Sequence, residues 1–260
     1  MQTVVDPAEG RLPGQSVAAL ARSYPDGHRL AFHRHDRGQL IYAVSGVMEI
    51  GLADRLWLVP PQRALWMPPG LDHRLAARGP VALRSVFVLP SAVPAGFPDR
   101  AMAVNVSPLL RELLQRAVSI PAGYAPEGRD GRIMELILHE IAWASDQPFD
   151  LPVGRDPRLR RVCDGILADP ASDRGLEEWA RETGASARTL ARLFERELGV
   201  PFRQWRQQAR ILTALPRLAA GEAVTLVALD LGYETPAAFT AMFRRIMGRT
   251  PSRYLNPSDH

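Results

Sequence analysis

Two histidines separated by one residue have a type and spacing that could do chemistry. They are His33 and His35, in the stretch HRHDRGQL. On a β-strand, alternate side chains point to the same side of the sheet, so both imidazoles can face the interior of a barrel. Imidazole nitrogens bind metal ions and exchange hydrogen bonds with organic ligands. The pair therefore predicts a ligand site in the N-terminal half of the chain.

The residues around this pair resemble the two sequence motifs of cupins. Gln39 follows His35 after three residues, and Gly46 follows after six more. The stretch from Pro68 to His73, PPGLDH, resembles the start of the second motif. The resemblance implies that His73, on a neighbouring strand, completes a three-imidazole set. Gln39 stands where the motif usually has a glutamate, and a neutral amide is a weaker metal ligand.

Three roles remain open for this set. In the first, a divalent metal ion such as Zn²⁺ is bound, with water at the open position; the candidate metal ligands are His33, His35, Gln39 and His73. In the second, the same four side chains contact an organic effector without a metal, and Trp66 lies near the pocket, because a barrel mouth is a usual place for a small ligand. In the third, the histidines are structural and satisfy one another.

A second candidate site lies in a helical pattern that occurs twice. The first copy reads LEEWARETGASARTLARLFERELGV and the second VTLVALDLGYETPAAFTAMFRRIMGR. Gly184 matches Gly232 at a spacing of 48 residues, and Phe194 matches Phe243 at 49. In each copy a helix, a glycine turn and a second helix with apolar residues at i, i+3 and i+4 follow one another. This order predicts two helix-turn-helix units, whose second helices enter the DNA major groove.

Residues 156–255 resemble the AraC/XylS family of transcription regulators. The motifs that carry the resemblance are Gly232-Tyr233, Ala238-Phe239, Phe243-Arg244 and Pro251-Ser-Arg-Tyr254. The resemblance implies binding to promoter DNA and favours a homodimer, and contact with RNA polymerase is expected of such a regulator. With the histidine stretch and PPQRALWMPPG, the chain is similar to the cupin-sensing subgroup that includes a nitroimidazole-response regulator, a match that identifies no effector.

The outward residues of the two second helices are the expected DNA contacts. Arginine can hold guanine bidentately, so Arg188 and Arg192 are predicted to read bases. The second recognition helix has few long donors, and could contact thymine methyls or read shape. The other groove-facing residues are Thr189, Ala191, Thr235, Pro236, Ala237, Thr240 and Ala241. The expected phosphate contacts are Arg203, Arg206, Arg244, Arg245, Arg249 and Arg253.

The elements that must position these residues change in type along the chain. Short strands cut by turns are expected over 16–22, 29–33, 39–44, 47–52, 55–59, 64–67, 73–76 and 81–88, a pattern typical of a small antiparallel barrel or jelly roll. Ser107-Pro108 is a good helix start. Another helix is expected from Asp130, with one face formed by Ile133, Leu136, Ile137, Ile141 and Ala144.

The helix expected from Asp130 is apolar over more than one stripe, because Met134 and Leu138 widen its apolar surface. Such a helix is either buried deeply or shared with a partner. Burial against its own barrel and a dimer interface are both open. The family resemblance favours the dimer.

The sequence predicts an α+β protein of two domains. Residues 1–150 form a cupin-like β-barrel with helices, for effector sensing and dimerisation, and residues 151–260 form an all-α domain with the tandem helix-turn-helix motifs. The linker is expected at 147–154, followed by a helix over 157–168. A connecting helix is expected from Pro201, and Pro216 should bend or break it.

Charge and composition agree with this division. All 32 basic residues are Arg; residues 151–260 hold 17 against 13 acidic residues, net +4, while residues 1–150 hold 15 against 15. The excess lies where a nucleic-acid binder needs it. Cys163 is the one cysteine, which excludes an intrachain disulfide. No membrane span or signal sequence is expected, so a cytoplasmic location is predicted.

The predicted function is a DNA-binding transcription regulator that responds to a small-molecule effector, and not an enzyme. A metal-dependent cupin enzyme is the first alternative, against which Gln39 and the DNA-binding half both argue. An effector-independent DNA-binding protein is the second. Site-specific DNA binding without turnover of candidate substrates would separate the regulator from the enzyme.

Overall fold

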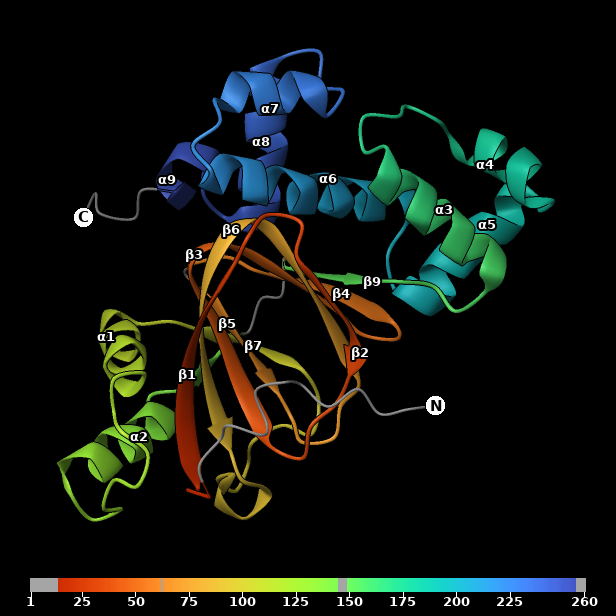
Figure 1. Cartoon of the computed structure of the whole chain (residues 1–260). Coiled ribbons are helices and arrows are strands. Elements are labelled where there is room, and N and C mark those ends of the chain that lie inside the picture. The colour runs from red at the N-terminus through yellow and green to blue at the C-terminus, as the bar shows by residue number, and fades with distance from the viewer. Residues whose placement is uncertain (1–13, 62, 145–148, 256–260) are drawn as a thin grey trace. The chain divides into compact units, whose positions relative to one another are not determined.

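The computed structural model describes residues 14–61, 63–144 and 149–255. The chain divides into two compact units: residues 1–52 with 58–147, and residues 53–57 with 148–260. The first is built on an antiparallel sheet with helices and the second is helical (Figure 1), which confirms the expected α+β fold.

The sheet follows the order β1-β6-β3-β5-β7-β8, with β2 paired to β6 and β4 paired to β3 and β9. The strands are β1 (Val17–Tyr24), β2 (Arg29–His33), β3 (Gly38–Gly51), β4 (Arg55–Val59), β5 (Arg63–Met67), β6 (His73–Val88), β7 (Met102–Asn105), β8 (Ala142–Trp143) and β9 (Asp150–Pro152). In Figure 1 the long strands curl around one another, so the sheet forms the expected barrel-like body.

Two long strands, β3 and β6, each replace a pair of expected short strands. They pair along almost their whole length, with register shifts between Ala43 and Ser45 and between Ser45 and Val47. Gly46 has φ +72°, and a Cβ there would collide with the carbonyl oxygen of Pro80. A bulge with glycine at a left-handed position bends a strand without ending it. The glycine that marked a break in the sequence therefore marks a bend.

Two helices cover one face of this sheet. α1 (Pro108–Ala117) begins as expected, because the Ser107 hydroxyl accepts the Leu110 amide at 3.0 Å. α2 (Arg129–His139) ends before Ile141, so the expected extension to Ala144 is wrong. Residues 142–143 instead form β8, which pairs with β7. The core between sheet and helices contains Leu40, Tyr42, Trp66, Val86, Val88, Val104, Leu110, Leu114, Met134, Ile137 and Leu138.

The short strands β7, β8 and β9 were not expected from the sequence. They are four, two and three residues long. Strands of this length carry too few side chains for a period of two to be visible, and pairing with a neighbour makes them strands. A short 3₁₀ turn, η2 (Pro90–Ala92), lies between β6 and β7.

The second unit contains two helix-turn-helix pairs, α4 (Leu176–Thr183) with α5 (Ala187–Leu193), and α7 (Val224–Asp230) with α8 (Pro236–Met247). The remaining helices are α3 (Pro157–Ala168), the π-turn η3 (Phe194–Leu198), α6 (Phe202–Ala219) and α9 (Pro251–Leu255). Gly184 and Gly232 make the two turns, with φ +65° and +76°. The duplicated helix-turn-helix and the helix over 157–168 are confirmed.

The connecting helix α6 runs without a break through Pro216. Of the two expected effects, the break is therefore wrong, and the bend stays a prediction. Pro216 lies in the last turn of the helix. Its missing amide leaves only the Leu212 carbonyl without its helical partner, and the helix ends three residues later.

The segment expected to be a linker contains β9, which belongs to the second unit. Residues 55–57 pair with residues 150–152, and Arg55 forms an ion pair with Asp150. The indole Nε1 of Trp205 donates to the Pro152 carbonyl at 2.8 Å, and Trp205 is fully buried. The stable second unit therefore begins before Gly154.

A fragment that begins at Phe149 should be more stable than one that begins at Gly154. The shorter fragment loses the buried Phe149 ring and leaves Trp205 Nε1 without its acceptor. These losses predict a decrease of about 3 kcal/mol in the free energy of unfolding. Urea denaturation of both fragments measures it. Equal midpoints would show that β9 contributes nothing to this unit.

Candidate functional site

The three histidines selected by the sequence lie together inside the first unit. His33 ends β2 and pairs with His73 at the start of β6, and His35 lies between β2 and β3. Their ring centroids are 4.3 Å apart for His33 and His73, 5.2 Å for His35 and His73, and 6.3 Å for His33 and His35. All three side chains are buried. Strand pairing thus joins the two motifs into one histidine cluster.

Each imidazole in the histidine cluster bonds a main-chain carbonyl two residues away through Nδ1. The pairs are His33 with Ala31 at 2.9 Å, His35 with Arg37 at 2.6 Å, and His73 with Leu71 at 2.9 Å. A carbonyl oxygen can only accept, so Nδ1 carries the proton in His33 and His73, and Nε2 is the nitrogen that these two rings leave for other partners. In the described part of the chain, His33 Nε2 is buried and has no hydrogen-bond partner.

Gln39 is held in a hydrogen-bonded chain. Its Oε1 lies 2.9 Å from His35 Nε2, and its Nε2 donates to Ser85 Oγ at 2.9 Å. Gln39 and Ser85 are buried, and the Phe87 ring lies edge-on against His35 with centroids 5.6 Å apart. The amide is therefore occupied in orienting His35.

Binding of a metal ion by the histidine cluster stays a prediction. Three ligand nitrogens of one Zn²⁺ would each lie about 2 Å from a common point. Among the described residues, no group of three or more His, Cys, Asp or Glu is arranged to hold a metal ion. The bond between His35 Nε2 and Gln39 holds that nitrogen in another contact.

Trp66 does not join the histidine cluster, which corrects the expectation that it lines the pocket. Gln39 pairs with Met67, and Leu40 pairs with Trp66. Because neighbours on a strand face opposite sides, Trp66 points to the side away from Gln39. There it is fully buried in the core beneath α1 and α2, and its Nε1 donates to the Pro98 carbonyl at 3.1 Å.

The first recognition helix, α5, presents two exposed arginines. Arg188 and Arg192 are exposed, and neither makes a hydrogen bond or ion pair within the described residues. Leu190, Leu193 and Phe194 are buried, as expected. Two of the other residues predicted to face the groove, Thr189 and Ala191, are half-buried. Thr189 Oγ1 also lies 2.9 Å from the N-cap hydroxyl of Ser186.

The second recognition helix, α8, presents small residues instead. Ala237 and Ala241 are exposed, and Thr240 and the N1 residue Pro236 are half-buried. Thr235 is the N-cap, and its hydroxyl accepts the Ala238 amide at 3.2 Å. The inward face is Phe239, Met242 and Phe243, as expected. The two helices therefore offer DNA different chemistry.

Most of the arginines expected at phosphates are exposed: Arg203, Arg244, Arg245, Arg249 and Arg253. Arg245 also donates to Gln207 Oε1 at 2.7 Å. Arg206 is different. It is half-buried and donates to the carbonyls of Asp173 and Arg174 at 3.3 and 3.1 Å. Burial, with the nearby Arg210, lowers its guanidinium pKa. Arg206 therefore also has a structural role as a hydrogen-bond donor, and its contact with phosphate stays a prediction.

Arg210 was missed by the sequence reasoning. Its side chain is buried, and its Nε donates to the Pro170 carbonyl at 2.8 Å. The available signal was its position on α6, beside Ala209 and four residues before Ala214, both on the buried face. A charged residue within an apolar stripe is buried only where it is paired.

Comparison with known proteins matches both units. Residues 16–139 match the family described as AraC-like ligand binding domain, and residues 179–257 match the family described as helix-turn-helix domain. The chain is 35% identical over 223 residues to the HTH-type transcriptional regulator NimR of Escherichia coli K12, covering 86% of this chain and 81% of NimR. It is also 35% identical over 103 residues to the regulator RipA of Corynebacterium glutamicum, covering 40% and 31%.

Among solved structures, the chain is similar to that of unsaturated-fatty-acid-bound ToxT from Vibrio cholerae. It is 13% identical, covers 94% of this chain and 96% of ToxT, and has a TM-score of 0.39. In the part of this chain that the structure describes, none of the helices is long and apolar enough to cross a membrane.

A ligand-binding sheet domain followed by two helix-turn-helix units defines a DNA-binding transcription regulator with a sensor domain. Its relatives over most or part of the chain are named transcriptional regulators. The chain belongs to the AraC family of transcription regulators.

Proposed function

We propose that the chain reads its operator mainly through α5 and responds to a small organic molecule bound at the histidine cluster. The observation that carries the DNA part is the exposure of Arg188 and Arg192 without protein partners among the described residues. Bidentate arginine–guanine contacts are the commonest specific contacts in the major groove. α8 would contribute methyl contacts and shape, and the exposed arginines outside α5 would hold phosphates.

The histidine cluster supports a ligand that offers hydrogen-bonding atoms to Nε2. A buried nitrogen such as His33 Nε2, with no partner in the described residues, costs free energy until a ligand satisfies it. We propose that the effector supplies this partner. A regulator of this kind acts by shifting populations and needs no turnover; metal-loaded protein that converts candidate substrates would contradict this.

Replacing His33 or His73 by alanine should remove the effector response. In a thermal-shift screen of aromatic heterocycles and carboxylates, a ligand that stabilises the native chain should lose most of that shift in either variant, because its buried partners are gone. His139, an exposed histidine on α2, provides the matched control. If His33→Ala and His73→Ala keep the full shift, the effector binds elsewhere.

A divalent ion such as Zn²⁺ is the second candidate occupant. Binding it would require His35 Nε2 to leave Gln39 Oε1. A carboxylate would offset the ion's charge, so Gln39→Glu should increase the zinc content of protein purified without chelator or His tag. Absence of zinc from both proteins would exclude a zinc site.

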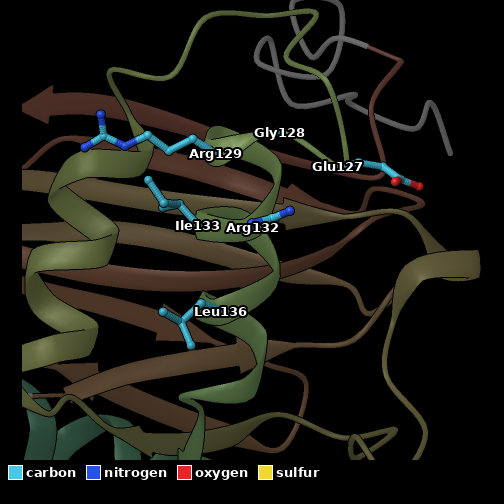
Figure 2. A pocket seen from close by; sticks show the side chains of 6 residues that line it. All are labelled: Glu127, Gly128, Arg129, Arg132, Ile133 and Leu136. Atoms are coloured by element: carbon cyan, nitrogen blue, oxygen red, sulfur yellow. The ribbon is translucent and has the colours of Figure 1, made fainter.

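We also propose a homodimer, with α2 in the interface. Its apolar surface is divided: Met134, Ile137 and Leu138 are buried, whereas Ile133 and Leu136 face away from the core, and Leu136 is 39% exposed. These two lie in an open hollow of about 670 Å³ (Figure 2), lined by Glu127, Gly128, Arg129, Arg132, Ile133 and Leu136. The lining combines the two apolar side chains with charged residues of both signs, and protein interfaces combine apolar and polar surface in the same way.

Leu136→Asp should therefore weaken dimerisation. A buried charge without a partner at an interface predicts a dissociation constant raised about ten-fold or more. Sedimentation equilibrium measures the change. Leu226→Asp is the control, because Leu226 is 57% exposed on α7. A normal dimer in Leu136→Asp would place the interface elsewhere.

Contact with RNA polymerase is proposed too, and in vitro transcription with purified polymerase tests it.

A further inference from the structure

Arg210 is a buried charge that the proposed DNA contacts do not use. Its guanidinium donates to three successive carbonyls, those of Pro170 at 2.8 Å, Ala171 at 3.4 Å and Ser172 at 3.3 Å. These carbonyls belong to the loop between α3 and α4. One side chain of the connecting helix therefore holds the loop that leads into the first helix-turn-helix, and buried charge is offset by these bonds.

The same loop touches the turn of the second helix-turn-helix. A Cβ placed on Gly232 would lie 2.5 Å from the Ala171 carbonyl oxygen. The next residue, Tyr233, has its ring centroid 5.1 Å from the guanidinium carbon of Arg210, within cation–π distance. Arg210, the carbonyls of residues 170–172, and Gly232 with Tyr233 thus form one junction, which we call the Arg210 junction.

The internal repeat shows that the helix-turn-helix fold does not itself require this junction. Gly184 matches Gly232, yet a Cβ on Gly184 would have nothing within 4 Å. Ala185 stands at the position of Tyr233 and offers no aromatic face to a cation. The turn of the first helix-turn-helix is open, whereas the turn of the second is packed against the loop between α3 and α4. We therefore interpret these contacts as holding the two helix-turn-helix pairs in a fixed arrangement.

A single connecting helix is a weak constraint on that arrangement. α6 has 18 residues, so its ends lie roughly 27 Å apart. A helix-turn-helix pair that is joined to one end of α6 by a short loop can still tilt relative to the helix. A second attachment near the middle of the helix removes this freedom. Two recognition helices on one DNA face must match its helical repeat, so such tilting changes which half-site spacing fits.

We propose that Arg210 is a positioning residue that fixes the distance between α5 and α8, and so selects the spacing of the two half-sites. It touches no base or phosphate in this role. The inference rests on the proposed reading of DNA by both recognition helices.

The first test measures spacing preference. Competition binding uses operators whose half-sites are moved apart or together by single base pairs. The proteins are the full native chain and the variants Arg210→Lys, Arg210→Gln and Tyr233→Leu. Lysine at position 210 keeps the positive charge but lacks the several planar donors of the guanidinium group. We expect the preference of the native chain for its best spacing over its neighbours to fall about ten-fold in the Arg210 variants. Arg203→Gln, an exposed arginine on α6, should weaken all spacings equally.

The second test needs no DNA. Spin labels on Glu195→Cys, in η3 after α5, and Ala241→Cys, on α8, report the distance between the two helix-turn-helix pairs. Both native residues are exposed. Burial raises the pKa of the Cys163 thiol to about 12, so it stays unreactive. We expect the distance distribution to widen in Arg210→Lys and Tyr233→Leu, two mild changes chosen to keep the fold.

The two readouts separate failure of this inference from failure of the proposed function. If the native chain binds no DNA specifically, the proposed function is wrong, and the distance distribution alone decides on the junction. An unchanged distribution in folded Arg210 variants would overturn the junction as a constraint. A wider distribution with an unchanged spacing preference would overturn its role in selecting sites.

Discussion

Replacing Arg188 or Arg192 by alanine is expected to relax base preference at one half of the operator and to lower specific affinity about ten-fold or more. A bidentate arginine–guanine pair discriminates by about 1–3 kcal/mol against the wrong base. Both side chains are exposed on α5 and make no hydrogen bond or ion pair within the described residues. Their removal should therefore change recognition without changing stability.

The control for this prediction is Arg249→Ala, which removes an exposed arginine expected at a phosphate. It should weaken binding to all sequences alike and reduce the slope of log affinity against log salt by about one. Selection of preferred sites with each variant, and affinities at several salt concentrations, measure both effects. If Ala237 or Thr240 variants alter the preferred site while both α5 variants leave it unchanged, α8 is the reading helix.

Gly232→Ala should destabilise the second unit much more than Gly184→Ala. Both glycines have left-handed backbone angles, so each substitution adds about 1–2 kcal/mol of backbone strain to the folded state. Only Gly232 adds a collision, with the Ala171 carbonyl oxygen at 2.5 Å from the new Cβ. Overpacking of this kind costs about 1–3 kcal/mol more, which predicts a total of about 3 kcal/mol or above.

Urea unfolding of the fragment that begins at Phe149 measures this difference, since a single unit is closer to two-state behaviour than the whole chain. Gly184 is the matched control, because it has the same turn conformation with open space around it. Equal losses at the two glycines would show that the loop yields to the added methyl group.

The repeat could be predicted from the sequence because its signals are local. Glycine turns and apolar residues at helical spacing act within a few positions of the chain. The cap of α1 by Ser107, outside the repeat, was predictable for the same reason. The cluster of histidines was expected from strand alternation. The structure brings them together differently, because His33 ends β2 and pairs with His73, whereas His35 lies between β2 and β3.

The remaining features depend on contacts between residues distant in sequence. The face of Trp66 depends on its pairing with Leu40, and β9 exists because residues 55–57 pair with it. Arg206 and Arg210 donate to carbonyls of the loop between α3 and α4, whereas Arg203 is exposed. Spacing along the helix could indicate that position 210 is buried, but not which carbonyls would receive its hydrogen bonds.

The chain of hydrogen bonds from His35 through Gln39 to Ser85 would add a free-energy cost to the binding of the proposed effector. A molecule that takes the Nε2 of His35 must first separate it from Gln39, and then leaves a buried amide oxygen to be satisfied. A ligand that replaces this hydrogen bond would lose little binding free energy. An apolar ligand of the same shape would leave two buried polar groups without partners and should bind weakly. If the proposed effector binds at the histidine cluster, its selection would therefore depend on this exchange of hydrogen-bond partners as well as on its shape.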